Sequence, residues 1–213
     1  RFMSIYAKEA RATFALALPI IVGQVSQMLM GITDSVMIGR VGTVPLAASA
    51  FANSVFGVVF MLGIGLLISV AVLVSRAHGG GNDAEAGVWL RHGVVVAAAM
   101  GLAGALGMAL LWTQIGALGQ PPEVVAAAGP YYLLIAASLV PTLLFQGFRQ
   151  FAEALGRPWV PMIMMLGGVA LNIFLNWVFI YGNLGVPALG LTGAGWATII
   201  ARTLGVVVIY MWL

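Results

Sequence analysis

An acid and two amides stand in stretches of the chain that are otherwise apolar. Asp34 lies toward the end of an apolar run over roughly 13–38, which also contains Pro19. A run of this length can cross a bilayer, because a spanning helix needs about 20 apolar residues. A carboxylate on such a helix costs about 2.5–3.5 kcal/mol near the membrane centre. We therefore expect Asp34 to face a bundle interior or a watery cavity and to have a function there.

The expected partners of this acid are Asn172 and Asn176, which share one helical face in LNIFLNWVFIYG because they are four residues apart. Asparagine offers a carbonyl oxygen to a cation or an N–H to a carboxylate. Thr198 adds a hydroxyl, and Ala194 adds a backbone carbonyl if its helical turn is irregular. This set predicts a site for a monovalent cation such as Na⁺, or a carboxylate that exchanges a proton. Alternatively, the asparagines only join helices, which is worth about 0.6 kcal/mol per hydrogen bond in membranes.

A narrow polar stripe accompanies the acid. Gln24, Gln27, Gly31 and Asp34 follow i, i+3, i+7, i+10 spacing, which places them on one side of a helix. We expect this side to line a cavity in which Gln24, Gln27 and Met30 contact the substrate. Methionine is flexible enough to form an adaptable wall for bulky apolar ligands, although packing is the commoner role of the eleven methionines.

The composition requires a membrane environment. Hydrophobic residues make up 62% of the chain and charged residues only 7%, against about 25% charged in soluble domains. The chain contains no cysteine, which excludes disulfides and thiolate metal sites. Its net charge of +3 is scattered among helix ends rather than clustered, so no nucleic-acid partner is predicted. The predicted fold is an all-α integral membrane protein.

The apolar runs predict a bundle of six transmembrane helices, over about 13–40, 46–77, 88–111, 123–155, 160–181 and 194–213. Pro130 and Pro141 interrupt the fourth. Its last turns carry four polar residues that we expect to reach water: Gln146, Arg149, Gln150 and Glu153. Aromatic residues near the helix ends are expected to anchor the bundle at the membrane interfaces: Trp112, Tyr131, Tyr132, Trp159 and Tyr181.

The basic residues predict the orientation. Seven of the nine fall on one side of the membrane if the helices alternate: Arg1, Lys8, Arg11, Arg76, Arg91, Arg149 and Arg157. Arg40 alone lies on the other side, so the positive-inside rule places both ends of the chain in the cytoplasm, in the cell (inner) membrane. Arg202 falls within the last helix, where it either lines a cavity or extends to the interface.

Enzymatic functions find no support in the motifs. An intramembrane serine protease needs a Gly-x-Ser-Gly serine and a histidine at membrane depth, and an ATP-driven pump needs a phosphate-binding loop with its lysine. Neither pattern occurs. His78 and His92 border a polar loop and are expected to be solvated rather than metal ligands.

Several segments resemble the multidrug and toxic compound extrusion (MATE) family: TDSVMIGRVGTVPLAA, VLVSRAHGGGN, ALGRPWVPM, and LNIFLNWVFIYG with LGLTGAGWAT. Such proteins have twelve helices in two six-helix lobes around a central cavity. The resemblance implies that residues 1–213 form the N-terminal lobe, that a C-terminal lobe absent from this chain belongs to the same polypeptide, and that no further cofactor is needed.

The resemblance also implies an activity, the export of cationic or amphipathic drugs in exchange for Na⁺ or H⁺. Asp34 corresponds to the acid that handles the coupling ion, with Asn172 and Asn176 on the fifth helix and Thr198 and the Ala194 carbonyl on the sixth. Many Na⁺-binding relatives have a second acid in place of Asn176, so this chain leaves the ion open.

Three further expectations follow from the resemblance. Pro19 matches a proline at which the first helix is proposed to bend when the acid is protonated. A lipid-linked oligosaccharide flippase of the same superfamily is the nearest alternative, and a cavity lined by several Arg or Lys would favour it. A channel or a non-transporting membrane scaffold is the more distant alternative.

Overall fold

The computed structural model describes residues 2–115, 119 and 121–213, with the backbone alone described at 2–9 and 12. This part of the chain forms seven α-helices: α1 (Phe2–Gly39), α2 (Thr43–Gly79), α3 (Asp83–Trp112), α4 (Pro122–Ala137), α5 (Leu139–Ala154), α6 (Trp159–Tyr181) and α7 (Gly190–Trp212). Helices α4 and α5 together make one span, so the described residues contain six helices long and apolar enough to cross a membrane. The predicted six-helix all-α membrane fold is confirmed.

The helices are longer than the apolar runs alone predicted. Helix α1 begins at Phe2 rather than near residue 13, since the polar opening of the chain continues the helix. Helix α3 begins at Asp83 rather than near residue 88, because the side chain of Asn82 caps it by accepting a hydrogen bond from the Glu85 N–H at 3.1 Å. Polar residues at the starts of α1 and α3 therefore extend these two helices past the apolar segments.

The fourth span breaks at Ser138, three residues before Pro141, and Pro130 does not interrupt it. Helix α4 continues through Pro130, and α5 starts at Leu139. Pro141 lies in the first turn of α5 and has no N–H for the carbonyl four residues earlier, that of Ala137, so the helix is interrupted just before it. The chain turns at Ser138 without leaving the bundle.

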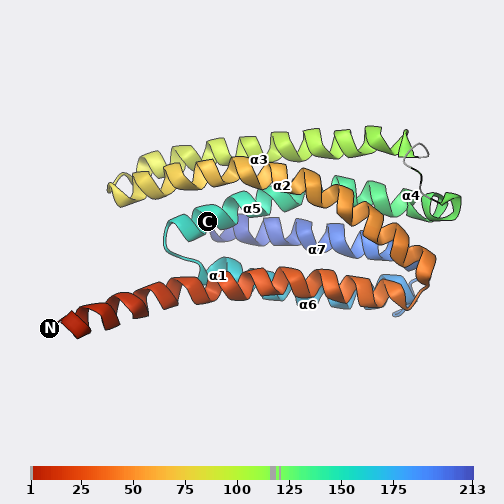
Figure 1. Cartoon of the computed structure of the whole chain (residues 1–213), viewed down its shortest axis with the longest axis horizontal. Helices are drawn as coiled ribbons and strands as arrows, with labels where there is room; N and C mark the ends of the chain where they lie inside the picture. Colours follow the sequence, from red (N-terminus) through yellow and green to blue (C-terminus); the bar gives the residue numbers. More distant parts are fainter. Residues whose placement is uncertain (1, 116–118, 120) are drawn as a thin grey trace.

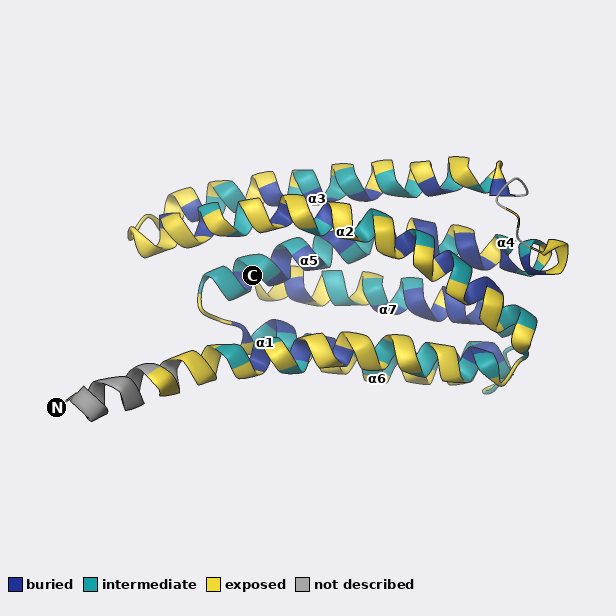
Figure 2. Ribbon diagram, in the orientation of Figure 1, coloured by how far each residue is buried: buried dark blue, intermediate teal, exposed yellow. Residues whose placement is uncertain are grey.

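The helices lie side by side along the long axis of the molecule (Figure 1). Pairs in extensive contact include α2 with α3, α3 with α5, α1 with α6, and α6 with α7. The α2–α3 turn and the α5–α6 connection lie toward the end from which α1 starts, while the α1–α2 and α6–α7 connections lie toward the opposite end (Figure 1). The outward faces of α1 and α3 are largely exposed (Figure 2), as expected for surfaces that lipid covers.

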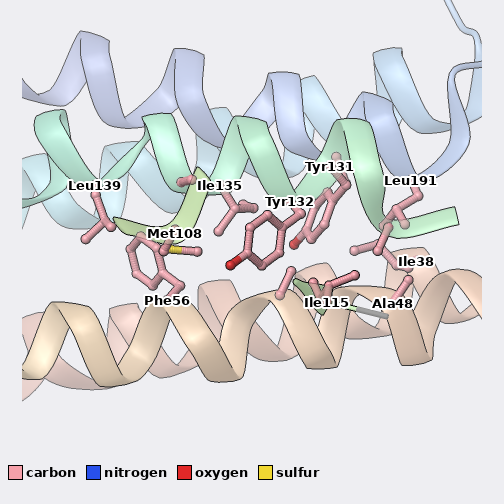
Figure 3. Packing of buried hydrophobic residues seen from close by; sticks show 14 of the residues in the cluster. Ile38, Ala48, Phe56, Met108, Ile115, Tyr131, Tyr132, Ile135, Leu139 and Leu191 are labelled. Carbon is pink, nitrogen blue, oxygen red and sulfur yellow. The ribbon is translucent and has the colours of Figure 1, made fainter. Parts of the chain in front are cut away.

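The two tyrosines of α4 form part of the core, so their predicted role as interface anchors is wrong. Tyr131 and Tyr132 are 1% and 0% exposed and lie between α4 and α2 (Figure 3). The Tyr132 ring packs 5.1 Å from that of Trp112 and 6.3 Å from that of Phe51, centroid to centroid. Helix α4 contacts α2, α3 and α7, and this surrounding protein buries both rings.

The expected exit of α5 into water is also wrong for two of its four polar residues. Gln146 and Arg149 are buried, and Arg149 is only 3% exposed. Its Nε donates to the Glu153 carboxylate at 2.7 Å, and its Nη1 donates to Gln146 Oε1 at 3.4 Å. A buried charge needs such partners, and α5 supplies them from its own next and previous turns.

Candidate functional site

The centre of the candidate site is a hydrogen-bonded chain from α1 to α6. Asn176 Nδ2 donates to Asp34 Oδ1 at 2.5 Å and to Asn172 Oδ1 at 3.1 Å. The first of these bonds joins residues 142 positions apart in sequence, and both asparagines are fully buried. The structure thus brings together the acid and the two amides whose spacing predicted a shared site.

Two atoms of the amides in this hydrogen-bonded chain have no hydrogen-bond partner among the described residues. Asn176 Oδ1 and Asn172 Nδ2 are both buried and unpaired within the described part of the protein. Most buried polar atoms are paired, so a free carbonyl oxygen on the amide that binds Asp34 is notable. A carboxylate and an amide oxygen are hard ligands for a monovalent cation, and a carboxylate can instead take up a proton.

Thr198 and Ala194 take no part in the hydrogen bonds between Asp34, Asn176 and Asn172. Both are buried on α7, where the Thr198 hydroxyl donates to the Ala194 carbonyl at 2.9 Å. The turn is regular helix, so the expected irregular turn that would free the Ala194 carbonyl is not present. No hydrogen bond joins either residue to Asp34, Asn172 or Asn176 among the residues that the structure describes.

A cavity of about 440 Å³ adjoins Asp34. Its wall comes from α1, α2, α5, α6 and α7, and the residues most relevant to a ligand are Gln27, Met30, Asp34, Asn53, Phe56, Phe60, Phe145, Met164, Met165 and Arg202. The predicted contacts Gln27 and Met30 therefore line it. Gln24 does not, because the cavity ends at Gln27 on this helix and the Gln24 side chain is exposed one turn further toward the start of α1.

Arg202, whose place the sequence left open, lines this cavity. Its Nη1 donates to Ser138 Oγ at 2.5 Å, and its guanidinium carbon lies 4.6 Å from the centroid of the Phe56 ring. Ser138 Oγ in turn donates to the Ile135 carbonyl at 2.7 Å. The interruption between α4 and α5 therefore positions the hydroxyl that holds Arg202. Sequence reasoning missed Ser138, although Pro141 three residues later was a usable signal.

Asn53 of α2 also lines the cavity and links it to the core. Its Nδ2 donates to the hydroxyl of Tyr131 at 3.1 Å.

Pro19 lies on α1 well away from the acid, 15 residues or about 22 Å along the axis. Helix α1 is continuous through Pro19, which is buried. The structure thus places the expected bending point within an unbroken helix.

The sequence matches the model of the MatE family over residues 19–178. Multidrug resistance protein PmpM of Pseudomonas aeruginosa is 34% identical over 194 residues, which cover 89% of this chain and 40% of PmpM. Multidrug resistance protein NorM of Aliivibrio fischeri is 34% identical over 195 residues, covering 92% and 42% of the two chains. The chain thus spans less than half the length of these relatives.

Solved structures share the fold. A multidrug resistance MATE family transporter of the MOP superfamily, in an outward-facing conformation, superimposes with a TM-score of 0.83 at 24% identity, covering 94% of this chain and 44% of its own. A MOP superfamily transporter from Pyrococcus furiosus gives a TM-score of 0.85 at 23% identity over similar shares. Because the family model matches residues 19–178, most of this multi-pass membrane chain, the chain belongs to the MatE family.

Proposed function

We propose that this chain is the N-terminal six-helix lobe of a secondary active transporter, which exports cationic or amphipathic drugs by antiport with H⁺ or Na⁺. The observation that carries the proposal is the partly buried bond from Asn176 to Asp34 at the edge of a cavity large enough for a drug-sized molecule. The transporter lies in the cell (inner) membrane with both ends of this chain in the cytoplasm. A second lobe of the same polypeptide completes the transport path.

The coupling step takes place at Asp34. Its carboxylate accepts a strong hydrogen bond from Asn176 only while it is charged, because a charged acceptor roughly doubles the strength of such a bond. Uptake of a proton, or of a cation that takes over the carboxylate oxygens, removes this attraction between α1 and α6. Helix α1 then repacks, the cavity changes shape and the drug is released.

The arrangement supports one ion at a time. Asp34 supplies one carboxylate and Asn176 one unpaired amide oxygen, whereas Thr198 and Ala194 are bonded to each other. A ligand shifts the cycle only by its difference in affinity for the two conformations, so either ion has to bind one conformation more tightly.

The oligosaccharide flippase is the less favoured alternative. A cavity that holds lipid-linked phosphates needs several basic side chains, and Arg202 is the sole Arg or Lys among the residues that line this one. Three phenylalanines and three methionines in the same wall suit a bulky apolar or aromatic drug instead.

The test is dye export by the complete transporter in liposomes, first under an imposed Na⁺ gradient and then under a pH gradient. Asp34→Asn is compared with Asp83→Asn, which removes an exposed carboxylate paired with His78. The proposal expects one gradient to drive export, Asp34→Asn to abolish it and Asp83→Asn to retain it. Export that ignores both gradients, or that survives Asp34→Asn, contradicts the proposal.

A further inference from the structure

The cavity carries two opposite charges that do not meet. Asp34 lies on α1 and Arg202 on α7, and both are wall residues of the same 440 Å³ space. Among the described residues, however, no ion pair joins them. The space between them is therefore open to an occupant that is itself dipolar.

Arg202 has unused hydrogen-bonding capacity on the cavity side. A guanidinium carries five N–H donors in a planar fork. Among the described residues, the side-chain hydrogen bond that Arg202 donates uses Nη1. Arg202 is half-buried in the wall of the cavity, so its remaining donors can bind a ligand there. A fork of this kind matches the two oxygens of a carboxylate.

The guanidinium is also held in place before any ligand arrives. Ser138 fixes one edge of it, and the Phe56 ring lies against its face at 4.6 Å. An arginine with one hydrogen-bonded edge and a stacked face loses less conformational entropy on binding an anion than a free side chain does. A purely structural arginine would instead direct its remaining donors at protein acceptors.

From these contacts we infer that Arg202 is an anion-binding subsite of the cavity, which recognises the carboxylate of a zwitterionic aromatic molecule whose cationic group faces Asp34. The phenylalanine and methionine side chains of the same wall contact its aromatic body. This inference rests on the proposed function for the identity of the cavity as a drug site, and it narrows the substrate class from cationic or amphipathic drugs to zwitterions.

Equilibrium binding tests the subsite without any transport step. The probes are a rhodamine dye with a free carboxylate and the methyl ester of the same dye, which differ only in that anion. Binding to the complete transporter in detergent is followed by fluorescence polarisation for the wild type, Arg202→Gln, Arg202→Lys and the control Thr203→Val. Thr203 is exposed on the same helix and bonds only the Ile199 carbonyl of its own helix among the described residues.

We expect the wild type and Thr203→Val to bind the acid more tightly than the ester. Arg202→Gln should weaken binding of the acid about tenfold and leave the ester nearly unchanged, since a charge-assisted hydrogen bond is lost. Arg202→Lys should recover part of the preference.

Three outcomes would overturn the inference. One is a wild type that binds both dyes equally, and another is an Arg202→Gln variant that loses both dyes equally. The third is displacement of the acid dye by phosphatidylglycerol at equal concentration, which would assign the guanidinium to a lipid phosphate.

The failure of the subsite can be distinguished from the failure of the proposed function. If any of these outcomes is found and export of the ester dye still depends on Asp34, the proposed function stands and only the subsite is contradicted. Conversely, a preference for the acid without any ion-driven export keeps the subsite and removes the transport proposal.

Discussion

Asn176 on α6 donates one amide nitrogen to both Asp34 on α1 and Asn172 one turn earlier on its own helix. The same NH₂ group therefore joins two helices and orders a second amide. Asn176→Asp therefore changes the charge of the site, the α1–α6 contact and the position of Asn172 at once.

Replacing Asn176 by aspartate should create a Na⁺ site stronger than that of the wild type. Two carboxylates at hydrogen-bond distance attract a cation that one carboxylate and an amide bind weakly. We expect Asn176→Asp to bind Na⁺ about tenfold more tightly than the wild type, or about 1.4 kcal/mol. The measurement is the rise in thermal unfolding temperature with NaCl against the same concentration of choline chloride. Equal stabilisation by both salts would contradict the prediction.

Removing the Ser138 hydroxyl should destabilise the bundle through Arg202. Ser138→Ala leaves the guanidinium without its partner at one edge, which costs about 1–3 kcal/mol for a charged group. The control is Ser54→Ala, because that hydroxyl is exposed and bonds only the Ala50 carbonyl of its own helix among the described residues. The free energy of unfolding in mild detergent should fall for Ser138→Ala and stay within about 0.5 kcal/mol for Ser54→Ala. Equal effects of the two variants would mean that the bond to Arg202 adds no stability.

Gly101 should not tolerate a side chain, although it lies within a helix. A Cβ at Gly101 of α3 would come within 2.7 Å of the Val140 Cα on α5, a backbone atom that cannot move alone. We expect Gly101→Ala to cost about 1–3 kcal/mol by overpacking. Gly107 of the same helix meets nothing within 4 Å, so Gly107→Ala should stabilise by about 0.5–1 kcal/mol through helix propensity. Thermal unfolding of the two variants distinguishes them, and a loss of stability in both would contradict the assigned contact.

The buried pair on α5 should be sensitive to removal of one partner and tolerant to removal of both. Arg149→Met leaves Glu153 without its cation and should cost about 3 kcal/mol. Arg149→Met combined with Glu153→Met removes both charges and should recover most of that loss. A double-mutant cycle on the free energy of unfolding measures the coupling. An additive cycle would show that the two side chains act independently.

The sequence predicted the membrane class and the six spans because apolar length decides both. It also predicted the meeting of Asp34 with Asn172 and Asn176, since polar groups on spanning helices have few partners other than one another. The sequence did not predict which aromatic side chains face protein and which face the interface. Tyr131 and Tyr132 are buried because of the neighbours of α4, and those neighbours depend on tertiary packing.

The position of Arg202 shows the same limit. An arginine within an apolar helix needs a polar partner, and Ser138 is 64 residues away in sequence. That partner becomes available only where α4 ends and α5 begins, a break that apolar length does not reveal. Local chemistry therefore indicated that Arg202 needs a polar partner but not that Ser138 would be this partner.

Each of the two side-chain amides on α6 also has a defined orientation of its oxygen and nitrogen. In the arrangement seen here the Asn176 amide donates to Asp34 and to Asn172, which suits a charged acid. The atoms left over, Asn176 Oδ1 and Asn172 Nδ2, are those that the opposite arrangement uses. Turning both side-chain amides over would let a neutral Asp34 carboxyl donate to Asn176 Oδ1, while Asn172 Nδ2 donates to the same oxygen. Protonation of Asp34 would thereby reverse the orientation of two side-chain amides, and the backbone of α6 need not move for this reversal.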